Sequence, residues 1–199
     1  GEGGVIPADP AYLQAVQQLC KERGLLLIID EVQTGFCRTG KWFGFEHSGI
    51  SPDAVTMAKG MGNGMPVGAL WARRDIAAVL QPGDHGSTYS GTALATAAVS
   101  AVISEMKRLH ADELAVRQGA RLTKGLLAIP KIESVRGAGL LLGAQLVEGV
   151  VAGDVYKALL EKGLIVNAVN ASTLRLAPPL TVSDAEIDEA VSLIAEVLS

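Results

Sequence analysis

Five consecutive aliphatic residues at positions 25–29 constrain the fold more than any other feature of this sequence. The run is bounded by Gly24 on one side and by Asp30 and Glu31 on the other. A short, unbroken aliphatic run of this kind is typical of a strand buried on both faces of a parallel sheet. Such a sheet needs helices on both faces, so the run indicates an α/β architecture.

The neighbouring segments support this architecture. Asp9 and Pro10 predict a helix start, and Gly24 predicts its end. Short apolar strands are expected at 54–58 and 68–72, followed by a long helix at 92–109. From residue 132 the elements become short and irregular, with a last helix opened by Ser183 and Glu186 as a capping box. We therefore expect two domains, 1–109 with a mostly parallel sheet and 110–199 as a small α+β domain.

The composition narrows the class of protein. Hydrophobic residues make up 49% and charged residues 19% of the 199 residues, which excludes a disordered chain. A mean hydropathy of +0.32 is high for a free-standing domain and predicts apolar surface that something outside this chain covers. The net charge of −4 gives no basic surface for nucleic acid or an anionic membrane.

Nothing in the sequence predicts a membrane span or a signal peptide. The uncharged stretch 86–104 opens with Gly, Ser and Thr, which suits a soluble helix better. Cys20 and Cys37 have no metal or redox spacing and are expected to be reduced thiols of a cytoplasmic protein. The histidines are too scattered for a metal site, so no metal is expected. The glycine-rich start without Met suggests a fragment of a longer protein.

Asp30 and Lys59 are the residues most suggestive of chemistry. Asp30 follows a buried strand, at the edge where open α/β sheets bind ligands, although it could simply cap the next turn. Lys59 ends an apolar strand among glycines, where desolvation favours the neutral, nucleophilic amine, although it could be a solvated lysine that opens a loop. Together they place an amine and a carboxylate in one crevice, which is the pair that pyridoxal phosphate requires.

Two further patterns bear on phosphate binding. The hydroxyls of Ser87 and Thr88 precede a helix and suit a phosphate, although both residue types are ordinary helix caps. The glycines that follow Lys59 have the wrong order for a dinucleotide fingerprint, and no lysine follows them as in a P-loop.

These residues resemble the signature of the class III pyridoxal-phosphate aminotransferases. The resemblance covers the whole chain and is carried by the blocks DEVQTGF (30–36), RTG (38–40), PD (52–53), TMAKG (56–60), HGSTY (85–89) and RLAPP (175–179). The spacing, together with the segments 136–139 and 167–170, is most similar to the acetylornithine branch. The fold implied is part of the large domain of fold type I plus the small C-terminal domain.

The resemblance implies a role for each matching residue. Lys59 would hold the cofactor and move the substrate proton, and Asp30 would pair with the ring nitrogen. Val32 would pack on the ring face and Gln33 would approach the phenolic oxygen of the ring. Ser87 and Thr88 would contact the cofactor phosphate of a partner subunit in a homodimer. Arg175 would bind a substrate carboxylate, with Glu2 as its alternative partner. The implied reaction moves the terminal amine of N-acetylornithine to 2-oxoglutarate, a step of arginine synthesis.

Other interpretations remain open from the sequence. The chain is also similar to class III enzymes that use succinylornithine, ornithine or 4-aminobutyrate, and a binding protein that keeps the fold without catalysis is conceivable. One departure concerns Cys37, which stands where the family usually has Gly, so the loop must accept a side chain there.

Overall fold

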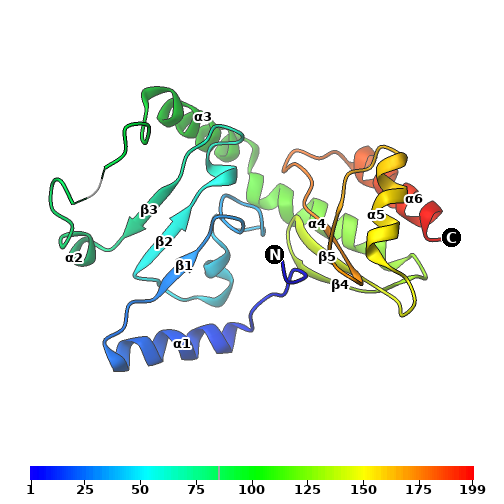
Figure 1. Cartoon of the computed structure of the whole chain (residues 1–199), viewed down its shortest axis with the longest axis horizontal. Helices are drawn as coiled ribbons and strands as arrows, with labels where there is room; N and C mark the ends of the chain where they lie inside the picture. The colour runs from blue at the N-terminus through cyan, green and yellow to red at the C-terminus, as the bar shows by residue number, and fades with distance from the viewer. Residues whose placement is uncertain (85) are drawn as a thin grey trace. The chain divides into compact units, whose positions relative to one another are not determined.

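The computed structural model describes residues 1–84 and 86–199 (Figure 1), which form two compact units. The lysine unit comprises Ala8–Phe36 and Lys41–His110. The arginine unit comprises Gly1–Pro7, Cys37–Gly40 and Ala111–Ser199. The names refer to Lys59 and Arg175, and each unit is described by itself.

The lysine unit is built on a three-stranded sheet with the order β1-β2-β3. Strand β1 (Ile28–Asp30) runs parallel to β2 (Ala54–Met57), which is antiparallel to β3 (Ala69–Ala72). The described part of this sheet therefore contains one parallel and one antiparallel pair. The helical elements of the unit are α1 (Pro10–Arg23), η1 (Gly44–Ser48), η2 (Lys59–Met61), α2 (Arg74–Ala77) and α3 (Ala93–Leu109).

Helix α1 confirms the predicted boundaries. The Asp9 side chain accepts a hydrogen bond from the Ala11 amide, and Gly24 ends the helix in the left-handed conformation at φ 63°. A glycine is favoured at that position because a side chain there would be strained.

The prediction that residues 25–29 are buried on both faces of the sheet is wrong for this chain. Leu25, Leu26 and Ile28 are 57%, 54% and 57% exposed, and β1 forms an edge of the described sheet. On β3, Leu70 and Trp71 are 61% and 50% exposed. The described residues place no layer over these side chains, in agreement with the apolar surface expected from the composition.

The arginine unit packs three helices on one face of a four-stranded antiparallel sheet with the order β4-β5-β7-β6. The strands are β4 (Ile132–Ala138), β5 (Leu141–Leu146), β6 (Asn167–Asn170) and β7 (Thr173–Leu176). The helices are α4 (Ala111–Leu127), α5 (Ala152–Glu161) and α6 (Asp184–Val197) (Figure 1). The predicted capping box of α6, formed by Ser183 and Glu186, is confirmed.

The two faces of this sheet differ in chemistry. One face joins the helices in a single apolar core, with buried leucines such as Leu142 on β5 and Leu174 on β7. Because side chains alternate along a strand, the other face carries Arg136, Gln145 and Arg175. Because only the apolar face of the sheet packs against the helices, the polar face is available for a binding site.

Among the described residues, no helix has the length and apolar character needed to span a membrane.

Candidate active site

Asp30 and Lys59 follow neighbouring parallel strands at the same edge of the sheet. Asp30 ends β1 and is paired in register with Thr56 of β2, and Lys59 follows β2 as the first residue of η2. Parallel strands present their carboxyl ends at one edge, so the amine and the carboxylate belong to the same edge. Asp30 also caps its turn, since its Oδ1 accepts the Val32 amide at 2.9 Å.

Lys59 has a backbone conformation that few side-chain-bearing residues adopt. Its φ of 42° lies in the left-handed region, which costs energy for a non-glycine residue and is often associated with functional sites. Within residues 1–84 and 86–199, neither its ammonium group nor the Asp30 carboxylate forms an ion pair. Both residues are exposed, so the desolvation expected at Lys59 is not found in this chain alone.

The turn after Asp30 is anchored by Glu31, whose carboxylate is almost completely buried at 1% exposure. It accepts hydrogen bonds from Thr34 Oγ1 at 2.5 Å, the Gly44 amide at 2.9 Å and the Phe45 amide at 2.8 Å. A buried carboxylate is tolerated when several donors satisfy it in this way. Glu31 therefore fixes the turn that carries Val32 and Gln33, both partly buried.

Ser87 and Thr88 lie in the segment between α2 and α3 and are exposed. The Ser87 carbonyl accepts a hydrogen bond from Ser90 Oγ at 3.4 Å. Among the described residues, no hydrogen bond joins either hydroxyl to Asp30 or Lys59. His85, which belongs to the same motif, lies outside the described residues.

In the arginine unit, Arg175 and Glu2 form an ion pair although they are far apart in the sequence. Arg175 lies on β7, and its side chain is 16% exposed. The Glu2 side chain is 81% exposed and belongs to a tight turn in which the Gly4 and Val5 amides both donate to the Gly1 carbonyl. The structure thus brings together the two residues expected at the substrate carboxylate.

Arg136 on β4, for which the sequence indicates no role, also contacts this turn. Its Nε donates to the Gly4 carbonyl at 2.8 Å, Nη1 to Gln145 Oε1 at 3.1 Å and Nη2 to Thr173 Oγ1 at 3.0 Å. The sequence does indicate a polar face here, because Thr173 and Arg175 are polar residues at alternating positions of one strand.

Segment Cys37–Gly40 is held within the arginine unit by Arg38. The Arg38 guanidinium donates to the Leu140 carbonyl at 3.1 Å and to the Pro178 carbonyl at 2.5 Å, and its burial lowers the pKa of the side chain. Cys37 is fully buried at φ 65°, a conformation that glycine adopts without strain. The loop does accept a side chain at position 37, in the left-handed region.

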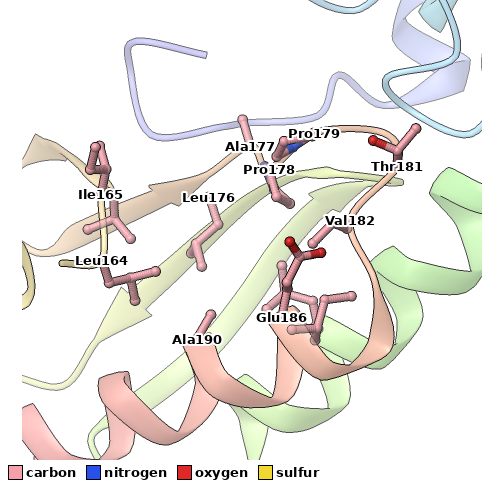
Figure 2. A pocket seen from close by; sticks show the side chains of 13 residues that line it. Leu164, Ile165, Leu176, Ala177, Pro178, Pro179, Thr181, Val182, Glu186 and Ala190 are labelled. Carbon is pink, nitrogen blue, oxygen red and sulfur yellow. The ribbon is translucent and has the colours of Figure 1, made fainter. Parts of the chain in front are cut away.

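A pocket of about 390 Å³ lies on the apolar side of the same unit (Figure 2). Leu164, Leu176 and Pro178 are among the side chains that line it, and Glu186 supplies a carboxylate. Glu186 is already engaged in the α6 capping box, which lowers its pKa. Leu176 points away from the face that carries Arg175, so this pocket is separate from the Arg175 site.

Comparisons with known proteins agree with this geometry. The family model described as "Aminotransferase class-III" matches residues 1–198. Acetylornithine aminotransferase of Caldanaerobacter subterraneus is 45% identical over 100% of this chain and 51% of its own length. The Bacillus subtilis enzyme of that name is also 45% identical, over 100% of this chain and 52% of its own length.

Solved structures match over the same extent. Ornithine aminotransferase from Toxoplasma gondii superimposes with a TM-score of 0.92 at 34% identity, covering 100% of this chain and 49% of that chain. A transaminase from the marine bacterium Virgibacillus gives a TM-score of 0.93 at 32% identity, covering 100% and 50%.

An α/β fold with a lysine and an aspartate at adjacent strand ends suits a pyridoxal-phosphate enzyme, and the comparisons specify the family. The chain belongs to the class III aminotransferases, a family that uses pyridoxal phosphate. It spans about half the length of the curated relatives that it matches.

Proposed function

We propose that this chain is part of an aminotransferase that transfers the terminal amine of N2-acetyl-L-ornithine to 2-oxoglutarate. The products would be N-acetylglutamate 5-semialdehyde and glutamate. The observation that carries the proposal is the parallel register that places Asp30 and Lys59 at one edge of the sheet. The choice of donor is supported by curated relatives at about 45% identity that are acetylornithine aminotransferases.

The residues at this edge fit pyridoxal phosphate. Lys59 offers a primary amine for its aldehyde carbon, and Asp30 offers a carboxylate for its ring nitrogen; neither is engaged in an ion pair with another described residue. When bound, the cofactor supplies an electron-accepting ring. We assign Val32 and Gln33 to the ring and Ser87 and Thr88 to the phosphate of a partner subunit, so that the enzyme is a homodimer with shared sites.

Within the chain itself, Lys59 is the group that can move a proton. Its exposed amine stands on a strained turn among glycines, and in its neutral form it would serve as the base for the substrate carbon. Asp30 is held by the Val32 amide, so its second oxygen has a fixed direction from which to hold a proton on the ring.

Arg175 and Glu2 supply the substrate contacts. The guanidinium can hold a carboxylate with two parallel hydrogen bonds. The donor carries no carboxylate on its reacting carbon, whereas 2-oxoglutarate does. Glu2 neutralises Arg175 while the donor is bound and leaves when the acceptor carboxylate arrives, so one pocket serves both substrates.

We also propose that residues 1–109 belong to a large domain of the enzyme and residues 110–199 to a small domain.

The test uses an enzyme of the full family length. It contains this chain together with the segment that the relatives have and this chain does not span. Steady-state kcat/KM is measured with 2-oxoglutarate and four donors: N-acetylornithine, succinylornithine, ornithine and 4-aminobutyrate. We expect the highest value for N-acetylornithine. An equal or higher value for ornithine, the substrate named for several similar structures, would move the assignment to that enzyme.

A further inference from the structure

Four residues form one row across the sheet of the arginine unit. Arg136 pairs with Gly143, Gly143 pairs with Arg175, and Arg175 pairs with Asn167 in the antiparallel register. Directly opposed residues of antiparallel strands project from the same face, about 5 Å apart. The two arginines therefore flank a position that has no side chain.

The turn Gly1–Val5 fills the space over that position. A Cβ added to Gly143 would lie 2.7 Å from the Gly4 carbonyl oxygen, which shows how closely the turn sits on the sheet. Gly4 has φ 119°, and a Cβ there would lie 2.8 Å from Arg136 Nη2. Glycine at both positions is what allows the backbone to approach the sheet this closely.

Arg136 ties the turn to the sheet. One of its nitrogens bonds to the Gly4 carbonyl, and the other two are held by Gln145 and Thr173, so the guanidinium is fixed in direction. Two residues before Gly4 along the chain, Glu2 pairs with Arg175. The position of the Glu2 carboxylate thus depends on a turn that Arg136 anchors.

The Glu2–Arg175 pair itself is weak. Because the Glu2 side chain is 81% exposed, its attraction to Arg175 competes with water and with any other carboxylate. Pairing costs both side chains rotamer entropy. An exposed pair is therefore well populated only when the backbone already holds its two members within reach of each other.

We propose that Arg136 is a positioning residue that sets how readily Arg175 exchanges Glu2 for a substrate carboxylate. This inference rests on the proposed function, because it concerns the balance between the amino donor and 2-oxoglutarate. With Arg136 in place, Glu2 is held beside Arg175 and the donor is favoured. Without it the turn is released, Arg175 is more often free, and the dicarboxylate acceptor is favoured.

The test compares Arg136→Gln, Arg136→Lys, Glu2→Gln and the double variant Glu2→Gln/Arg136→Gln in the complete enzyme. Thr173→Val is the matched control, because it removes one partner of Arg136 without touching the Gly4 contact. Hydrogen–deuterium exchange of residues 1–7 reports the anchoring, and KM and kcat are measured separately for donor and acceptor.

We expect the Gly4 and Val5 amides to lose their protection from hydrogen–deuterium exchange in Arg136→Gln. Arg136→Lys should keep part of this protection, and the control Thr173→Val should keep all of it. We expect the KM for 2-oxoglutarate to fall about threefold to fivefold, as loss of an exposed ion pair implies. The donor kcat/KM should fall, and the double variant should match Glu2→Gln.

Unchanged hydrogen–deuterium exchange at Gly4 and Val5 in Arg136→Gln would overturn the claim that Arg136 anchors the turn. Additive effects of Glu2→Gln and Arg136→Gln on KM would overturn the claim that Arg136 acts through Glu2. Failure of the proposed function is seen separately, as the absence of aminotransfer by the unmodified enzyme. In that outcome the substrate balance assigned to Arg136 is also overturned, while the exchange data still decide the anchoring.

Discussion

Replacing Gly143 by alanine is expected to destabilise the protein by displacing the turn Gly1–Val5. The new Cβ would stand 2.7 Å from the Gly4 oxygen, so that oxygen must retreat by more than half an ångström to reach the 3.4 Å of ordinary contact. The obstacle is backbone rather than the end of a flexible side chain, and the retreat stretches the bond from Arg136.

The expected size follows from two opposing effects. Overpacking of a close contact costs about 1–3 kcal/mol, and a weakened hydrogen bond to a charged group costs up to about 1.5–3 kcal/mol in addition. Alanine in place of glycine returns about 0.4–1 kcal/mol by restricting the unfolded chain. At mid-range these three contributions leave a net loss of about 2–3 kcal/mol, or about 4–12 °C in Tm for a chain of this length.

Thermal unfolding measures this directly, with Gly153→Ala as the matched control. Gly153 lies in α5 of the same unit, and an added Cβ there has no described heavy atom within 4 Å. Alanine in a helix should raise stability by up to about 1 kcal/mol. Equal Tm values for the two alanine variants would refute the claim that the turn is seated on Gly143.

Three further predictions concern other parts of the chain. Borohydride reduction of the complete, cofactor-loaded enzyme followed by peptide mapping should find the adduct on Lys59, and an adduct on another lysine would contradict the assignment. Glu31→Gln should lower the free energy of unfolding in urea by about 1–3 kcal/mol, because an amide cannot accept all three donors that the buried carboxylate satisfies, and an unchanged midpoint would argue against this anchor. The hydrogen bond from Arg121 lowers the pKa of Asp188, so its stabilising effect is present above about pH 4 and disappears as the pH falls through the lower folded-state value. The Tm difference between the protein and Asp188→Asn should therefore narrow as the pH falls below about 4, and a constant difference would contradict the sign.

Local sequence signals were sufficient to predict the boundaries of helices that have capping residues. Asp9 and Gly24 bound α1 as expected, and Ser183 and Glu186 open α6. Caps and turns act over a few residues, so their physics is contained in the local sequence. For the same reason the strand ends at Asp30 and Lys59 could be recognised as a candidate site.

Features that depend on distant partners could not be found in this way. Strand β4 was not expected, because the segment around Arg136 has no apolar run and pairs only through the register of β5. The exposure of Leu25 depends on what lies above it, which no local pattern encodes. The contact between Arg136 and Gly4 joins residues 132 positions apart, so a single sequence cannot reveal it.

The groups proposed for cofactor chemistry and for substrate selection belong to different compact units. Asp30 and Lys59 are in the lysine unit, whereas Glu2, Arg136 and Arg175 are in the arginine unit. Anchoring Glu2 through its turn uses backbone and sheet contacts that involve neither Asp30 nor Lys59. On the proposed roles, we expect substitutions around the Gly1–Val5 turn to alter the preference between donor and acceptor while the attachment of the cofactor to Lys59 is kept. The preference between amino donor and acceptor would therefore change without any change at Asp30 and Lys59, because the contacts that hold Glu2 and Arg175 are separate from those that hold Asp30 and Lys59.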